Sequence, residues 1–473
     1  MSTDVARPLR ILIAGGGIGG LFAAIALRKT GHVIFESSSF GGDLGSVIQL
    51  PPNANGLLRR FGIIPEKFRA TDANFVTFYD SQGETVRSRD VRGLREEYPF
   101  PWQFTHRVDL REALRGEAMS SEGAGTPVTI HLDSKVMDCD PAVPSVTLAD
   151  GHVFAGDLVI GADGVHSVLR SIISETIAPY PSGASVTQFL VPISKIRANP
   201  KTKDLVFREG ELQIWKGEYR KLVIYPCRNN TGLDFVCLYL YTKSEHDIEG
   251  RDVVGWHDSL IQAYETFAPA LKSLIGLADP ASIKVCLMLD RDPSGTWVRR
   301  KACLLGDAAH PALAYQCQGS AQAIEDGASL AALLPLGTHP NEVPYRLQHY
   351  MTSRQKRRSL VESLLRQLES RIREIDHTGG ITKDCKPFSL PLPTYRLTLQ
   401  LWNLCGSTLT TTHMTMPQMS FSKQKPKVPN SNSIMARINT LGRAIHHLKS
   451  HLGHPFPAPT KMGPAPSWRE QYT

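Results

Sequence analysis

The first part of the chain alternates short apolar runs with one amphipathic stretch. Residues 10–14 form an apolar run of strand length, and residues 21–29 have helical spacing with small residues on the packing face. Residues 33–36 form a second apolar run, which is short and ends on an acid. A strand, a helix and a strand in this order predict a βαβ unit.

A glycine-rich loop, Gly15–Gly20, joins the first strand to the helix. Gly15 permits a tight turn, Gly17 leaves room for a pyrophosphate beside the backbone, and Gly20 allows the helix and strand to pack closely. The helix N-terminus offers N–H groups and a partial positive charge to phosphates. Glu36 lies about twenty residues further on, where an acid can bind a ribose. The segment predicts a dinucleotide site and leaves open whether the ligand is FAD or a nicotinamide nucleotide.

Strand patterns dominate residues 185–242 and predict a mostly antiparallel block between the nucleotide-binding segments. The expected strands are Phe189–Val191, Leu205–Phe207, Leu212–Trp215, Leu222–Tyr225 and Phe235–Tyr239. Other expected elements are a hairpin over residues 74–83 and helices over residues 256–275, 321–334 and 344–375. Beyond about residue 385 the chain becomes rich in Pro, Ser and Lys, which is typical of disorder.

Composition and charge narrow the class of protein. The chain has 473 residues and a net charge of +8, but residues 385–473 hold ten Lys and Arg and one acid, a net charge of +9 that leaves −1 for the rest. The body therefore has no basic excess that would indicate nucleic-acid binding. The eight cysteines are scattered without a CxxC pair, so we expect reduced core thiols and no metal site. No apolar run is long enough to span a membrane and no signal peptide is visible, so we expect a cytoplasmic protein.

Two further turns follow apolar strands later in the chain. Gly161–Gly164, which contains Asp163, ends one strand, and Gly306–Pro311, which contains Asp307, ends another. A third glycine-bearing turn, Gly319–Ser320, leads into a helix. An aspartate between a strand and a helix is often a plain N-cap, so either aspartate alone is a weak signal.

With these motifs in this order and at these separations, the chain resembles the class A FAD-dependent monooxygenases of the para-hydroxybenzoate hydroxylase type. The likeness runs from about residue 8 to residue 369 and is greatest to the fungal salicylate-hydroxylase-like branch. It implies an α/β fold, with a Rossmann-like FAD-binding domain, an inserted, mostly antiparallel β-sheet substrate domain and a helical or disordered C-terminal tail. The implied domains are the first part of the FAD-binding domain (8–180), the substrate domain (181–290), the second part of the FAD-binding domain (291–375) and the tail (385–473).

The resemblance also implies the residues that contact FAD. They are Gly15, Gly17, Gly20, Glu36, Gly45, Ser46, Arg107, Asp163, Asp307, Gly319 and Ser320. Glu36 would hold the adenosine ribose, Asp307 the ribityl chain, and Arg107 the pyrophosphate or flavin edge. The ordinary alternatives are an N-cap for Asp163 and Asp307 and a solvated helix residue for Arg107. Within this motif, His310 is more often structural than a base.

The resemblance implies oxygen insertion into a small molecule, with a place in fungal secondary metabolism. NAD(P)H reduces FAD, molecular oxygen forms a flavin C4a-hydroperoxide, and the distal oxygen is transferred to an aromatic or other electron-rich substrate. Tyr225 would orient a substrate hydroxyl, although a core tyrosine is about equally expected. Gln188 stands where many fungal relatives carry an arginine that faces the flavin, so this chain keeps a hydrogen-bonding group there without the cation. We therefore take Tyr225 and Gln188 as the candidate catalytic residues.

Three alternatives remain open from the sequence. The same machinery serves a flavin epoxidase that acts on a prenylated or polyene substrate. A flavin dehydrogenase or reductase would use the cofactor without inserting oxygen. A flavin-binding remnant with low activity is the third alternative, because of Gln188, the short second strand and the unusual tail. The sequence does not indicate the substrate, the choice between NADH and NADPH, or the oligomeric state.

Overall fold

The computed structural model describes residues 7–28, 32–35, 46–123, 125–174, 180–205, 207–217, 220–240, 253–290, 295–311 and 318–377. All of these residues belong to one compact unit, Met1–Thr408. Glu36, Gly45 and the expected tail over residues 385–473 lie outside the described residues. None of the described helices is both long enough and apolar enough to cross a membrane.

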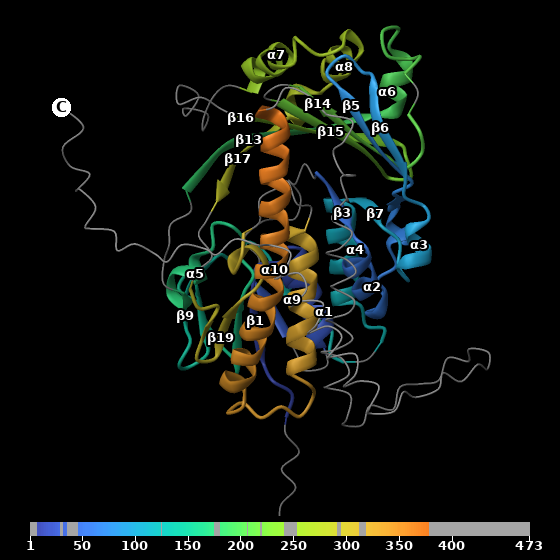
Figure 1. Ribbon diagram of the computed structural model, residues 1–473. Helices are drawn as coiled ribbons and strands as arrows, with labels where there is room; N and C mark the ends of the chain where they lie inside the picture. Colours follow the sequence, from blue (N-terminus) through green and yellow to red (C-terminus); the bar gives the residue numbers. More distant parts are fainter. Residues whose placement is uncertain are drawn as a thin grey trace, which may run out of the picture. The chain divides into compact units, whose positions relative to one another are not determined.

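A six-stranded sheet with the order β18-β19-β12-β1-β2-β8 carries the predicted βαβ unit (Figure 1). Its strands are β1 (Ile11–Ala14), β2 (His32–Phe35), β8 (Thr129–His131), β12 (Leu158–Gly161), β18 (Val298–Arg299) and β19 (Ala302–Leu304). All neighbours are parallel except β18 and β19. The strand β1 is buried along its whole length, which explains its continuous apolar sequence.

Helix α1 (Ile18–Leu27) connects β1 to β2 and packs against α9 (Gly319–Leu333) and α4 (Arg107–Met119). The contact between α1 and α9 is close because a Cβ atom on Gly327 would lie 2.9 Å from the ring of Phe22 and 3.1 Å from the backbone of Ala23. The long helix α10 (Val343–His377) packs against α9 in turn. The sequence predictions for α1, α9 and α10 are confirmed to within a few residues.

The second large sheet has seven strands in the order β17-β13-β16-β15-β14-β5-β6. Its strands are β5 (Phe75–Asp80), β6 (Thr85–Asp90), β13 (Tyr180–Pro192), β14 (Glu211–Lys216), β15 (Arg220–Cys227), β16 (Gly232–Leu240) and β17 (Lys284–Asp290). Every pair is antiparallel except β5 and β14. The predicted hairpin is therefore present as β5–β6, and it adds two strands from the N-terminal part of the chain to this sheet.

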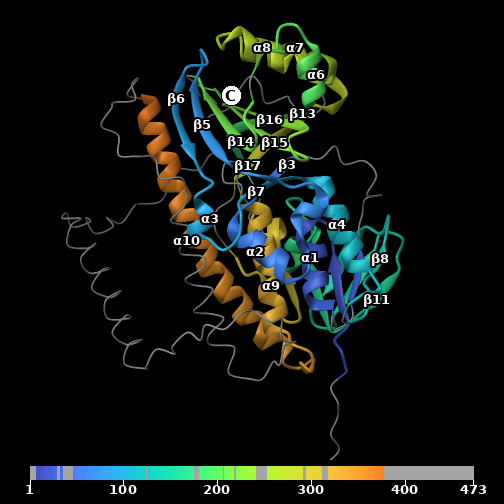
Figure 2. The same cartoon turned by 90° about the vertical axis from the view of Figure 1, so that its right-hand side faces the viewer.

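One face of this sheet is covered by α6 (Ile193–Ala198), α7 (Val253–Ala263) and α8 (Pro269–Ile275) (Figure 2). Their apolar side chains share a core with strand residues, for which the stacked rings of Phe189 and Phe235 are an example. The single predicted helix over residues 256–275 is divided into α7 and α8, with Pro269 at the start of α8. The predicted strand Leu205–Phe207 is wrong, because Leu205 and Phe207 lie outside the strands and pack into this core instead.

Two small three-stranded sheets and several short helices complete the described part of the chain. One sheet has the order β3-β7-β4 and the other β11-β10-β9. These strands are β3 (Val47–Leu50), β4 (Thr71–Asp72), β7 (Gln103–His106), β9 (Val136–Asp140), β10 (Ser145–Leu148) and β11 (Val153–Ala155), and the helices are α2 (Pro52–Arg60), α3 (Leu94–Glu97) and α5 (Val168–Ile173). The β3-β7-β4 sheet packs against the seven-stranded sheet, where the rings of Phe104 and Tyr225 stack 5.6 Å apart.

Candidate cofactor and substrate site

The predicted cofactor motifs meet at one edge of the parallel sheet. Ala14 of β1 is paired in register with Gly161 of β12, and Gly161 with Leu304 of β19. The glycine loop, the Asp163 turn and the Asp307 turn each follow one of these strand ends. In parallel α/β sheets, the carboxyl ends of the strands are where ligands bind. The fold therefore brings together segments that are far apart in the sequence.

The glycine loop is tightly packed at both ends and open in its middle. Gly15 has φ +108°, and a Cβ atom there would overlap the carbonyl oxygen of Ala162. A Cβ atom on Gly20 would overlap the carbonyl oxygen of Gly15. At Gly17, by contrast, a Cβ atom would meet no atom within 4 Å, and no side chain caps the N-terminus of α1. Open space beside uncapped helix N–H groups fits the pyrophosphate of a dinucleotide.

Asp307 lies next to this loop in the short 3₁₀ turn η5 (Gly306–Ala308). Gly19 of the loop packs closely against the turn and α9. A Cβ atom on Gly19 would lie 2.6 Å from the Leu305 side chain before the turn and 3.1 Å from the Ala323 side chain of α9. The Asp307 side chain is exposed, and no described residue donates a hydrogen bond to it. The N-cap of the turn is Leu305, so Asp307 does not serve as the cap. A free carboxylate beside the loop fits the predicted contact with a cofactor hydroxyl.

Asp163 differs from Asp307 because its carboxylate is engaged within its own loop. It accepts hydrogen bonds from the Ser167 hydroxyl at 2.5 Å and from the Leu169 N–H at 3.1 Å, at the start of α5. The N-cap of α5 is Ser167, so Asp163 is not the N-cap residue itself, but its carboxylate satisfies a backbone N–H in the first turn of the helix. A contact between Asp163 and the cofactor stays a prediction.

Arg170 supports the site through hydrogen bonds that the sequence reasoning missed. It is buried, and its guanidinium donates to the carbonyls of Asp307 at 2.6 Å and Ala308 at 2.7 Å. It also donates to the carbonyls of Gly164 at 3.1 Å and Val165 at 2.8 Å. The Arg170 side chain thus bridges the turn that contains Asp163 and the turn that contains Asp307. The basic residue shortly after the Gly161–Gly164 turn was visible in the sequence, but its partners were not.

A buried ionic network holds the second turn against α9 and α10. Asp326 of α9 binds His310 at 2.6 Å, the Gly306 N–H at 2.9 Å and Arg354 of α10 at 2.6 Å. Burial disfavours the Asp326 charge, but His310 and Arg354 outweigh burial and lower the pKa of Asp326 to about 2. The His310 ring contacts both Asp326 and the ring of Trp297, which supports the interpretation of His310 as structural.

The remaining predicted cofactor residues lie at two places. Ser46 and Arg107 are adjacent, because the Arg107 N–H donates to the Ser46 carbonyl at 2.9 Å at the end of the β3–β7 pair. The Arg107 side chain is exposed. Gly319 and Ser320 form the first turn of α9, whose N-cap, Gln318, makes no capping hydrogen bond with its side chain. Contacts of these residues with the cofactor stay predictions.

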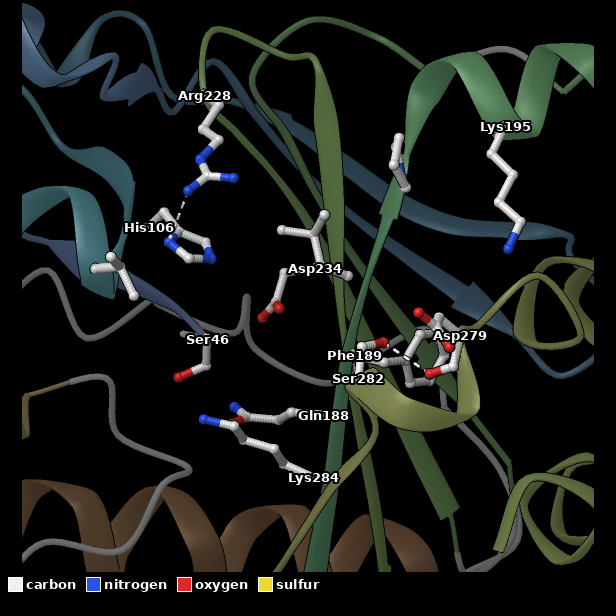
Figure 3. Close-up of a pocket in the computed structure, with 13 residues that line it drawn as sticks. Ser46, His106, Gln188, Phe189, Lys195, Arg228, Asp234, Asp279, Ser282 and Lys284 are labelled. Carbon is white, nitrogen blue, oxygen red and sulfur yellow. Dashed lines mark hydrogen bonds between the residues drawn. The ribbon is translucent and has the colours of Figure 1, made fainter. Parts of the chain in front are cut away.

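A cavity of about 450 Å³ lies between Ser46 and the seven-stranded sheet (Figure 3). Its apolar wall is formed by Val108, Phe189, Leu190 and Pro192, and its polar residues include Ser46, His106, Gln188, Lys195, Arg228, Asp234, Asp279, Ser282 and Lys284. Gln188, predicted from the sequence, therefore lines the cavity. It is paired in register with Lys284 across β13 and β17, and Figure 3 shows the two side chains side by side.

Tyr225 lies behind the cavity wall and does not line it. It is 6% exposed, and its single hydroxyl proton can be donated either to the Val47 carbonyl, 3.2 Å away, or to Asp234. The structure thus shows a core tyrosine whose polar end reaches the acid beside the cavity. Its direct contact with a substrate stays a prediction.

Asp234 and Arg228 are cavity residues that the sequence reasoning missed. Arg228 is held by Asp109, with Nε to Oδ2 at 2.9 Å and an Nη to Oδ1 at 2.7 Å. Asp234 is 1% exposed, and burial raises its pKa well above the ordinary value. The sequence feature that could have identified Asp234 is the presence of an acid within the largely apolar strand Gly232–Leu240.

Two other expectations concern cysteines and metals. Four cysteines have described side chains (Cys139, Cys227, Cys237 and Cys303), and all four are buried free thiols. No group of His, Cys, Asp and Glu within the described ranges is arranged to hold a metal ion.

The chain is similar to known flavin-dependent monooxygenases over most of its length. No family model matches the sequence. The FAD-dependent monooxygenase cfoG of Aspergillus candidus is 33% identical over 376 residues, which cover 75% of this chain and 84% of the relative. Hispidin-3-hydroxylase of Neonothopanus nambi is 31% identical over 75% of this chain and 86% of the relative. A 3-hydroxybenzoate 6-hydroxylase of Polaromonas naphthalenivorans is 29% identical over 80% of this chain and 91% of the relative.

Solved structures show the same fold at lower identity. CtdE in complex with FAD and a substrate has a TM-score of 0.69 at 21% identity, and the match covers 84% of this chain and all of CtdE. Klebsiella pneumoniae HpxO complexed with FAD and uric acid has a TM-score of 0.65 at 22% identity over 86% of this chain and 98% of HpxO. The predicted fold class is confirmed. With relatives above 30% identity matched over most of their length, the chain belongs to the class A FAD-dependent monooxygenases of the para-hydroxybenzoate hydroxylase type.

Proposed function

We propose that this chain hydroxylates an aromatic secondary metabolite that binds in the cavity between Ser46 and the seven-stranded sheet, with NAD(P)H and molecular oxygen as co-substrates. The observation that carries this proposal is the cavity itself, which combines an apolar wall with polar groups that can orient a substrate. One side of it is formed by a residue expected to contact FAD, and the other by β13, β16 and β17.

One set of residues would bind the cofactor, and another would enclose the substrate. The open space at Gly17 and the free carboxylate of Asp307 would bind FAD, and Arg170 would keep the turns around it in place. When bound and reduced, FAD supplies the chemistry that activates oxygen. The apolar wall at Phe189 and Leu190 would exclude water from that reaction. We keep residues 181–290 as the proposed substrate domain, to which the hairpin β5–β6 is added.

The charge of the cavity favours a substrate with an anionic group. Lys195 and Lys284 line it, and neither forms an ion pair with a described residue. Asp109 pairs with both Arg228 and Arg69, and the lining also contains the acid Asp279, so the two lysines leave a net positive formal charge in the cavity. The name of the bacterial relative contains an aromatic acid, 3-hydroxybenzoate, which supports the same class of substrate.

The test is a screen of the purified holoenzyme. NADPH and NADH oxidation and oxygen uptake would be measured with a panel of phenols, aromatic acids, indoles and prenylated aromatics, and products would be identified by mass. We expect a hit that couples oxygen uptake to a product heavier by one oxygen atom. Substrate oxidation without an added oxygen would indicate a dehydrogenase instead. Protein without flavin absorbance, or with FAD that neither nucleotide reduces, would indicate a flavin-binding remnant.

A further inference from the structure

We propose that Asp234 is a substrate-binding residue that donates a hydrogen bond from its carboxyl group to an oxygen atom of the substrate, and that Tyr225 acts through Asp234. This inference deepens the proposed function and rests on it. It assigns the site a substrate with a carbonyl or phenolate oxygen that reaches the buried wall of the cavity.

The strand register places Asp234 where it can serve both the cavity and Tyr225. On β16 it is paired with Tyr225 of β15 on one side and with Leu190 of β13 on the other. Register partners on neighbouring strands point to the same face of a sheet. Leu190 lines the cavity, and Figure 3 shows the Asp234 carboxyl group pointing into the space between Ser46 and Gln188.

The two oxygens of Asp234 have different surroundings. The backbone N–H of Val47 and the Tyr225 hydroxyl hydrogen-bond this carboxyl group. Oδ2 is buried and has no hydrogen-bond partner in the described part of the chain, so both contacts belong to Oδ1. A buried polar atom without a partner costs free energy unless a ligand or water satisfies it. We therefore assign the contact with a ligand to this free oxygen.

The protonation state decides what this free oxygen offers. Burial raises the pKa of Asp234 well above 3.8, and no described cation forms an ion pair with it. The other charged or titratable side chains that line the cavity are His106, Lys195, Arg228, Asp279 and Lys284. When Tyr225 turns its single hydroxyl proton from the Val47 carbonyl to Asp234, Oδ1 accepts from both Tyr225 and the Val47 N–H, and the carboxyl proton belongs on Oδ2. A protonated carboxylic acid is a hydrogen-bond donor.

The amide of asparagine has the same shape and the same donor–acceptor pattern as a neutral aspartic acid. Asp234→Asn keeps an acceptor for Val47 and Tyr225 and a donor toward the cavity, whereas Asp234→Leu removes both. We expect Asp234→Asn to bind the best compound from the screen within about twofold of wild type, and Asp234→Leu to bind it roughly fivefold to tenfold more weakly. Affinity would be measured from the change in flavin absorbance of the holoenzyme on titration. Asp90→Asn, which removes an exposed acid that does not line the cavity, is the control and should leave affinity unchanged.

A second readout does not depend on finding a substrate. Infrared difference spectra of holoenzyme, wild type minus Asp234→Asn, should contain the carbonyl stretch of a protonated carboxylic acid at pH 7. The wild type minus Asp90→Asn difference should lack it, because the pKa of Asp90 is lowered to about 2. The band should shift when a ligand binds, and Tyr225→Phe should shift it without a ligand. Absence of the band would overturn the proposal, even if no compound in the screen binds. Equal affinity of Asp234→Leu and wild type would also overturn it, while failure of the whole screen with the band present would count against the proposed function alone.

Discussion

Gln188 and Lys284 are register partners on β13 and β17, and their side chains lie side by side in the cavity. Many fungal monooxygenases that this chain resembles carry an arginine where this chain has Gln188. The structure shows an ammonium group on the neighbouring strand. The cation that is absent from position 188 is therefore present in the same cavity, which weakens the case for an inactive remnant.

Substitution of Lys284 tests its role in binding an anionic substrate. Lys284→Gln removes the charge but keeps a polar side chain, so we expect KM for an aromatic acid to rise about tenfold with a smaller change for a neutral phenol. Lys284→Arg should keep KM within about threefold. Steady-state kinetics at low and high salt would check this, because screening should reduce the difference between wild type and Lys284→Gln. Equal effects on neutral and anionic compounds would contradict it.

The glycine loop allows cofactor binding to be separated from folding. Gly17→Ala adds a methyl group in open space, so the thermal midpoint of the apoprotein should stay within about 2 °C of wild type. The same methyl group occupies the space expected for the pyrophosphate, so FAD affinity should fall roughly tenfold or more. Gly20→Ala is the contrasting variant, since its Cβ atom would overlap the Gly15 carbonyl and should destabilise the apoprotein itself. Apoprotein melting and a fluorescence titration with FAD give the two readouts.

Much of the fold was predictable because its signals are local. The βαβ unit with Gly15–Gly20 and the turn at Gly306–Pro311 were all visible as short patterns with known geometry. Leu205–Phe207 was mistaken for a strand because an apolar run does not reveal whether it pairs or only packs.

The polar residues that complete the site depend on contacts that the sequence does not encode locally. Asp234 reaches the cavity through the register of β13, β15 and β16, and Arg170 meets the Asp307 turn across 137 positions of sequence. Asp326 and Arg354 lie on different helices, and the helical patterns over residues 321–334 and 344–375 do not reveal that these two side chains meet. An acid inside an apolar strand was the one local sign that could have pointed to Asp234.

The two aspartates of the cofactor motifs should respond differently to substitution. Asp307 has no partner among the described side chains, so Asp307→Asn should lower FAD affinity about tenfold while leaving apoprotein stability unchanged. The Asp163 carboxylate satisfies a backbone N–H in the first turn of α5, so Asp163→Ala should lower the unfolding free energy by about 1 kcal/mol. Chemical denaturation of the apoprotein and FAD titration would separate the two effects. A loss of apoprotein stability in Asp307→Asn would contradict the assignment of a free carboxylate.

The network around Asp326 predicts a specific loss of stability in acid. The pKa of Asp326 is lowered from 3.8 to about 2, and that of Glu325, which pairs with Arg357 and Arg354, from 4.5 to about 2. Because both folded-state values are depressed, the stabilisation is fully present above the unfolded-state values and is lost as pH falls from about 4.5 to about 2. Asp326→Asn should leave Arg354 buried with one carboxylate fewer and cost about 3 to 5 kcal/mol at pH 7.

The decisive comparison is the pH dependence of the two proteins. Wild type should lose unfolding free energy between pH 4.5 and pH 2, and Asp326→Asn should lose less over the same range because one of the two groups no longer titrates. Urea denaturation at several pH values measures this difference. Asp90→Asn is a suitable control, since Asp90 also has a pKa of about 2 but is exposed and paired only with the nearby exposed Arg92. Its substitution should change stability very little, so a drop as large as that of Asp326→Asn would show that burial of the network is not what makes it stabilising.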